Sequence, residues 1–181
     1  MHFPNDPSSG RQAIDPDALR SRPAQDAVQS RCPHLFRYGW SRRAPRILVV
    51  EDNMDSAEVL GIVLGAMGFE VQAAHDGPAG LRLATQWRPT LVVSDIDLPG
   101  CDGFELAGAL RGLPQLEQVP LIALTGRWHE RDWVRALDAG FTRYLTKPVD
   151  PDRLGETICE LLDRRRAGMQ VAYRGPERRM H

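Results

Sequence analysis

The stretch Arg46-Ile-Leu-Val-Val-Glu-Asp-Asn53 marks the point at which this 181-residue chain changes character. Ile47–Val50 is an uninterrupted apolar run rich in β-branched residues, which predicts a buried β-strand. A helical pattern follows from about Met54 to Met67 and stops at Gly68, a residue type that commonly ends helices. A strand followed directly by a helix is the first unit of an alternating α/β fold.

The same alternation continues along the next part of the chain. Strands are predicted at residues 47–50, 69–73, 91–94, 119–124 and 141–145. Helices are predicted at residues 54–67, 78–87, 103–111, 130–139 and 151–165, with Asp102 and Asp150 as N-terminal caps. Short apolar strands joined by helical crossovers form a parallel sheet covered on both faces, which is a three-layer sandwich. Ligands of such sheets lie at the carboxyl ends of the strands.

Composition excludes several classes of protein. No apolar run approaches the length of a membrane span, and the N-terminus lacks a secretory pattern. We therefore expect a cytoplasmic protein that makes no membrane contact. The three cysteines, Cys32, Cys101 and Cys159, lie far apart without a C-x-x-C pair. This spacing argues against a zinc site or a disulfide framework.

Charge divides the chain into three parts. Residues 1–45 carry a net charge of +3, residues 46–163 a net charge of −9, and residues 164–181 a net charge of +5. An acidic central part argues against nucleic acid as its ligand and fits a cation site. We expect residues 1–44 to be a disordered or weakly ordered extension and residues 45–163 to be the single folded domain. Residues 164–181 form a basic tail, too short for an output domain.

One apolar cluster, His34–Trp40, interrupts the otherwise polar extension. Three interpretations of this cluster stay open. It is a short docking motif, a segment that lies against the folded domain, or sequence upstream of the true start of translation.

The chain uses arginine for twenty-two of its twenty-three basic residues, and the single lysine is Lys147. A guanidinium is a broad planar group, whereas an ammonium is a compact charge that can reach a single anionic oxygen. Retention of lysine in Thr146-Lys147-Pro148 therefore suggests an anion site at this position. The alternative is that a composition biased toward arginine leaves one lysine by chance.

Polar residues follow four of the predicted strands. Glu51 and Asp52 follow the first strand, Asp95 and Asp97 the third, Thr125 the fourth and Lys147 the fifth. The carboxyl ends of parallel strands meet at one edge of the sheet, so we expect these side chains to converge. Several carboxylates in one cleft need a cation, and oxygen ligands of this kind suit Mg²⁺. Asp95, at the end of the central strand, is the predicted nucleophile for a phosphoryl group.

Four segments together resemble the receiver domain of bacterial two-component response regulators. They are Arg46–Asn53, Val93–Gly103, Ala123–Gly126 and Tyr144–Pro148, in the order and spacing of that family. The resemblance covers about residues 45–163. It implies a flavodoxin-like, doubly wound, five-stranded parallel sheet of order 2-1-3-4-5 with five helices. It also suggests a stand-alone receiver of the chemotaxis type.

The resemblance assigns roles to individual residues. Asp95 would accept a phosphoryl group from a sensor histidine kinase or a histidine phosphotransfer protein. Mg²⁺ would be held by Glu51, Asp52, Asp95 and the main-chain carbonyl of Asp97, and Thr125 would contact the phosphoryl group.

Other implied roles concern the output of the signal. Lys147 would contact the phosphoryl group and precede a cis peptide bond, and Tyr144 would be a switch residue that turns inward as Thr125 moves. An unknown downstream protein would bind the surface formed by the fourth helix, fifth strand and fifth helix, and a homodimer is possible. Asp97 and Arg127 would form a salt bridge that slows loss of the phosphoryl group.

Under this interpretation the protein is not an enzyme beyond its own phosphorylation and dephosphorylation. Two alternatives remain. Asp95-Ile96-Asp97 is similar to the D-x-D motif of haloacid-dehalogenase-type phosphatases, although Glu51-Asp52 and Lys147-Pro148 fit that family poorly. The other alternative is an adaptor that works without phosphorylation.

Overall fold

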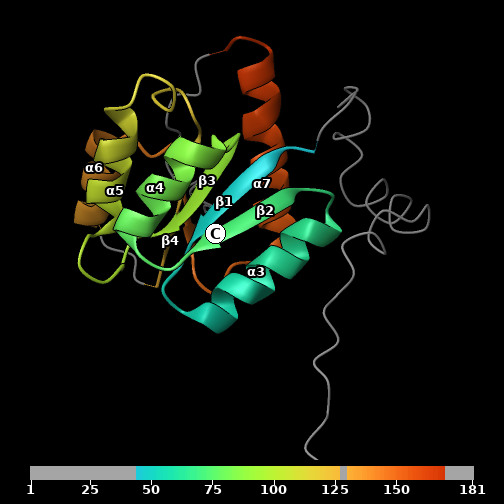
Figure 1. Cartoon of the computed structure of the whole chain (residues 1–181), viewed down its shortest axis with the longest axis horizontal. Helices are drawn as coiled ribbons and strands as arrows, with labels where there is room; N and C mark the ends of the chain where they lie inside the picture. The colour runs from blue at the N-terminus through green and yellow to red at the C-terminus, as the bar shows by residue number, and fades with distance from the viewer. Residues whose placement is uncertain (1–43, 127–129, 170–181) are drawn as a thin grey trace, which may run out of the picture.

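The computed structural model describes residues 44–126 and 130–169, and the side chains of residues 130–133 and 137 lie outside the description. Strands and helices alternate along these residues (Figure 1). The strands are β1 (Arg46–Val50), β2 (Glu70–Ala74), β3 (Leu91–Asp95), β4 (Leu121–Thr125) and β5 (Arg143–Thr146). The helices are α3 (Met54–Ala66), α4 (Gly77–Trp87), α5 (Gly103–Arg111), α6 (Glu130–Ala139) and α7 (Pro151–Arg166).

The strands form one parallel sheet in the order β2-β1-β3-β4-β5, as predicted. Helices α4, α5 and α6 cover one face, and α3 and α7 cover the other (Figure 1). Successive residues of a strand point to opposite faces, so each face has its own core. Leu48 and Val50 of β1 pack into the core on the α4–α6 side, whereas Ile47 and Val49 pack with α3 and α7.

Side-chain caps begin four of the helices. The carboxylate or amide oxygens of Asn53, Asp76, Asp102 and Asp150 accept from main-chain N–H groups two or three residues later, at 2.6–2.9 Å. Such caps satisfy donors that the first helical turn leaves unpaired. The caps at Asp102 and Asp150 were predicted, and the helices start within one residue of the predicted positions.

Two strands, β4 and β5, start two residues later than predicted. The N–H of Val119 donates to the carbonyl of Leu116 in a turn, so β4 begins only at Leu121. The N–H of Phe141 donates to the carbonyl of Ala136, which makes Phe141 part of the C-terminal end of α6, and β5 begins at Arg143. In both places an apolar residue was assigned to a strand because its side chain is common in strands. Its main-chain N–H group, however, forms a hydrogen bond within the preceding turn or helix end.

The guanidinium of Arg111 joins two connections at the amino end of the sheet. It donates to the carbonyl of Gly140 at 2.6 and 3.0 Å, to that of Glu117 at 2.8 Å and to that of Val119 at 2.7 Å. Burial lowers the pKa of Arg111, partly offset by the charge of Glu117. This side chain thereby ties the connection after α5 to the turn after α6.

Within the described residues, no helix combines the length and the apolar character that crossing a bilayer requires.

Candidate functional site

The carboxyl ends of β1 and β3 place two carboxylates side by side in the interior. Asp95 is the last residue of β3 and Glu51 follows β1 directly, and their exposed fractions are 5% and 2%. Asp52, the next residue, is exposed. Neighbouring strands β1 and β3 end at the same edge of the sheet, and this is why residues 44 positions apart in the sequence meet.

Lys147 supplies the positive charge between these carboxylates. Its Nζ atom lies 2.5 Å from Oε2 of Glu51 and 2.5 Å from Oδ2 of Asp95. The lysine side chain is 28% exposed, whereas both carboxylates are nearly inaccessible. The predicted convergence of β1, β3 and β5 on one site is therefore present in the structure.

Two opposing effects act on the pKa of Lys147. Burial lowers the pKa, but the hydrogen bonds and negative charges of Asp95 and Glu51 outweigh it, so that the pKa lies above the ordinary lysine value. The ammonium is therefore charged throughout the neutral range.

Carboxylate oxygens of Glu51, Asp52 and Asp95 all lie within 4.8 Å of one another. All the donor atoms of this set are oxygens, which Mg²⁺ prefers as ligands. Asp52 is exposed, so a hydrated cation can reach the site from solvent. The residues present therefore fit a hard divalent cation. These are the three side chains predicted to hold Mg²⁺.

The loop after Asp95 folds back on the carboxylate of this residue. The N–H of Asp97 donates to Oδ1 of Asp95 at 3.1 Å, and the N–H of Gly103 donates to the carbonyl of Ile96 at 2.8 Å. A Cβ atom on Gly103 would lie 2.4 Å from the carbonyl oxygen of Asp95, which is closer than any side chain tolerates. The start of α5 thus packs directly against the end of β3. The side chain of Asp97 is exposed.

The remaining predicted residues lie at the ends of β4 and β5. Thr125 ends β4 and is 4% exposed, and its carbonyl accepts from the N–H of Lys147 at 2.7 Å. Tyr144 is 6% exposed and already belongs to the core on the α4–α6 side. The Lys147–Pro148 bond is cis, as predicted. Arg127 lies outside the described residues.

Sequence reasoning missed two residues of the site. Gly103 was assigned only to a helix start, and no pattern around it indicated its close approach to β3. His75 was not assigned to the site, and its ring is exposed, yet Nδ1 lies 3.0 Å from the carbonyl oxygen of Glu51. No sequence signal pointed to that contact, because it joins the loop after β2 to the loop after β1.

Comparison with known proteins supports the same assignment. Residues 47–159 match the family model of the response regulator receiver domain. The "uncharacterized 14.6 kDa protein in sodA1 3′region" of Leptolyngbya boryana is 46% identical over 105 residues, which cover 58% of this chain and 80% of that protein. The transcriptional regulatory protein PrrA of Mycobacterium leprae is 40% identical over 124 residues, 68% of this chain and 52% of that protein. The DNA-binding dual master transcriptional regulator RpaA of Synechocystis is 35% identical over 120 residues, 66% of this chain and 50% of that protein. The chain thus spans only about half the length of the regulators that it matches.

Solved structures agree with the fold. A CheY-like response regulator receiver domain protein of Methanospirillum hungatei has a TM-score of 0.66 and 31% identity, over 70% of this chain and 99% of that one. The chemotaxis response regulator CheY4 of Vibrio cholerae has a TM-score of 0.63 and 28% identity, over 66% of this chain and 99% of that one. The fold, the converging site residues and these matches lead to one conclusion: the chain belongs to the family of response regulator receiver domains of two-component systems.

Proposed function

We propose that the chain is a phosphorylation-dependent switch in which Asp95 accepts a phosphoryl group from a phosphohistidine. One observation carries this proposal: the ammonium of Lys147 lies 2.5 Å from a carboxylate oxygen of Asp95 and 2.5 Å from one of Glu51. A buried carboxylate next to a fixed positive charge, at the open end of a parallel sheet, is placed to act as a nucleophile.

The transfer is a single displacement at phosphorus. An oxygen of Asp95 attacks, an O–P bond forms, and the N–P bond of the donor breaks so that the electron pair leaves with the imidazole. Lys147 then pairs with a phosphoryl oxygen in place of the carboxylate oxygen that it contacts before transfer, and the hydroxyl of Thr125 donates to another. No redox partner is needed.

Glu51, Asp52 and Asp95, with the main-chain carbonyl of Asp97, would hold Mg²⁺ at this site. The cation would neutralise the negative charge that gathers where carboxylates and a phosphoryl group meet. The charges of the described residues support this role, because Lys147 offers one positive charge to the three carboxylates of Glu51, Asp52 and Asp95.

The proposed donor is a sensor histidine kinase or a histidine phosphotransfer protein. The proposed downstream partner is a protein that binds the surface of α6, β5 and α7. Tyr144 of β5 is buried in the core on the α4–α6 side, and Thr125 ends the neighbouring strand β4, at the same edge of the sheet as Asp95. Asp97 and Arg127 are proposed to set the lifetime of the phosphoryl group, and the chain is proposed to catalyse only its own phosphorylation and dephosphorylation.

The proposal is tested by incubating the full chain with Mg²⁺ and a small acyl phosphate, and measuring the intact mass. We expect the addition of one phosphoryl group to the parent and none to an Asp95→Asn variant. Replacing Mg²⁺ with a chelator should abolish the addition.

The same experiment separates the alternatives. With a small phosphate ester in place of the acyl phosphate, release of many equivalents of inorganic phosphate per chain would support a haloacid-dehalogenase-type phosphatase instead of a receiver. An unchanged mass with every donor tested would support an adaptor that works without phosphorylation, and would overturn the proposal.

A further inference from the structure

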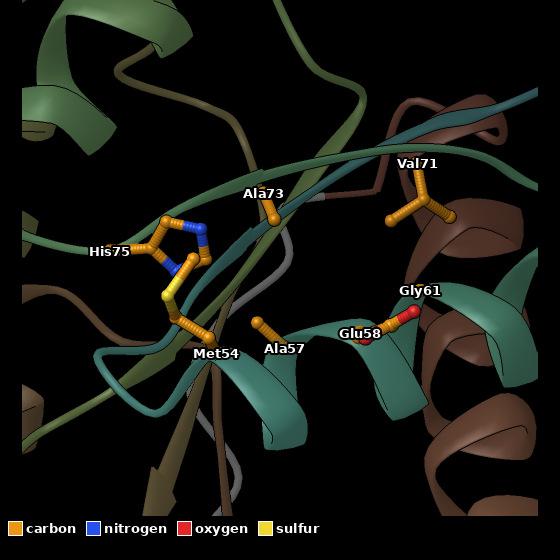
Figure 2. A pocket seen from close by; sticks show the side chains of 7 residues that line it. All are labelled: Met54, Ala57, Glu58, Gly61, Val71, Ala73 and His75. Atoms are coloured by element: carbon orange, nitrogen blue, oxygen red, sulfur yellow. The ribbon is translucent and has the colours of Figure 1, made fainter. Parts of the chain in front are cut away.

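A shallow groove lies between α3 and the edge strand β2. Its volume is about 370 Å³, and Figure 2 shows its lining, with Met54, Glu58 and Gly61 on α3 facing Val71 and Ala73 on β2. The side chain of Met54 is 68% exposed. A Cβ atom on Gly61 would meet no atom within 4 Å, so the missing side chain leaves the helix side of the groove open.

The backbone beside this groove offers free hydrogen-bonding positions. The N–H of Glu70 donates to the carbonyl of Pro45, and the carbonyl of Ala74 accepts from the N–H of Glu51, so both residues face β1. Backbone groups of a parallel strand alternate in direction, and those of Val71 and Ala73 therefore point away from β1. β2 is the outermost strand of the sheet that the structure describes, so these groups lie on an edge to which another strand can pair.

The groove is lined mainly by apolar residues, but the stretch of chain that forms it is acidic, whereas the segment that precedes the domain is basic. Residues 47–81 contain six acidic residues and neither lysine nor arginine. Residues 27–43 contain four arginines and neither aspartate nor glutamate. Within that basic segment, aromatic rings occupy every second position at His34, Phe36, Tyr38 and Trp40. This alternation is the pattern of a strand with one apolar face.

We propose that residues 34–40 of the same chain pair with the outer edge of β2, antiparallel to it, and lay their aromatic face into the α3–β2 groove. The backbone groups of Val71 and Ala73 would then form main-chain hydrogen bonds with the segment, which is recognition by strand addition. Arg37 alternates with the aromatic residues and would therefore point to the opposite face of the sheet. The proposal concerns the unphosphorylated protein and does not depend on phosphorylation of Asp95.

The length of the connection fits this arrangement. Pro45 lies opposite the start of β2, since its carbonyl accepts from Glu70 at 3.0 Å. Four residue steps separate Trp40 from Ala44 and reach about 13–14 Å when extended. Val71 pairs with Ile47 and so lies three residues, about 10 Å, along the strand direction from Ala44, while the outer edge of β2 lies two strand spacings, about 10 Å, to the side of β1. The distance to cover is therefore about 14 Å, so that a fully extended connection just brings Trp40 beside Val71 and Tyr38 beside Ala73, and the chain direction on entry to β1 makes the pairing antiparallel.

A connection this short also favours binding within one chain over binding between chains. Flexible tethers of a few residues give an effective concentration on the order of millimolar. A second copy at micromolar concentration would have to bind roughly a thousandfold more tightly to compete. We therefore assign the groove to the chain's own segment and not to a second copy.

Amide hydrogen exchange, measured by NMR on the full chain at micromolar concentration, tests the proposal. We expect the amides of Val71 and Ala73 to exchange at least ~10-fold more slowly than unprotected amides. A variant with Phe36→Ser, Tyr38→Ser and Trp40→Ser should lose this protection. The amide of Gln72, which faces β1, should stay protected in both proteins and shows that the fold is intact.

Two matched variants test the groove itself. Gly61→Leu fills the groove and should expose the amides of Val71 and Ala73, whereas Gly65→Leu should leave them protected. Gly65 lies on the same helix, also meets no atom within 4 Å of an added Cβ, and does not line the groove.

Three results would overturn the assignment. The first is unprotected amides at Val71 and Ala73 in the parent. The second is protection that survives replacement of the three aromatic residues. The third is protection that fades on dilution, which would place a second copy on the edge.

Discussion

Replacing Lys147 with methionine tests how the site balances its charges. Methionine keeps an unbranched side chain but removes the ammonium that lies 2.5 Å from both Glu51 and Asp95. Two carboxylates with exposed fractions of 2% and 5% would then face each other without a positive partner. We expect the variant to be less stable than the parent in the absence of divalent cations.

The size of the loss follows from the burial of the three groups. Leaving a buried ionic partner uncompensated costs about 3–5 kcal/mol. The lysine side chain is 28% exposed, so water already weakens the interaction that is lost. We therefore expect a loss of about 2–3 kcal/mol, a large share of the roughly 5–15 kcal/mol by which domains are stable.

The assay is urea unfolding followed by far-ultraviolet circular dichroism, at neutral pH with a chelator and then with millimolar Mg²⁺. Because the cation would occupy the same carboxylates, we expect Mg²⁺ to stabilise Lys147→Met more than it stabilises the parent. Lys147→Arg, which keeps a positive charge, is the matched control and should lose less than the methionine variant.

Two outcomes would refute the reasoning. A methionine variant as stable as the parent in chelator would mean that the carboxylates do not need the ammonium. An equal gain from Mg²⁺ in both proteins would mean that the cation and Lys147 do not share a site.

Three further predictions follow from particular contacts. Arg111→Met should lower the free energy of unfolding by about 2–4 kcal/mol, measured by urea unfolding, because several carbonyls including that of Gly140 lose a buried charged donor; a loss below about 0.5 kcal/mol would contradict this. The raised pKa of Lys147 means that its stabilising effect is complete below the ordinary lysine pKa and is lost only as the pH rises through the raised value. The stability gap between the parent and Lys147→Met should therefore stay constant from about pH 7 to about pH 9, and a gap that closes within this range would show that the pKa is not raised. Asp97→Asn should lose its phosphoryl group faster than the parent, followed by intact mass over time, and an equal or slower loss would remove Asp97 from the control of lifetime.

Local patterns were enough to place the elements of the sheet. The apolar run at Ile47–Val50, and those like it, indicated buried strands, because the inner strands of a parallel sheet covered on both faces are apolar throughout. The starts of two strands were predicted wrongly because the side chain of a residue suggested a strand while its main chain forms hydrogen bonds elsewhere. Val119 and Phe141 have strand-forming side chains, but their N–H groups are used in a turn and a helix end, and hydrogen bonds of that kind do not appear in a residue pattern.

The sequence by itself determined which residue types follow each strand, and hence that Glu51, Asp95, Thr125 and Lys147 share one edge of the sheet. Only the tertiary structure decided that the ammonium of Lys147 touches both buried carboxylates, because that contact depends on the packing of strands that are remote in the sequence. The close approach of Gly103 to the acceptor strand and the groove between α3 and β2 have the same origin. The spacing of residues along the chain predicts which side chains lie at the same edge of the sheet. The distances between those side chains depend on how the helices pack against the sheet.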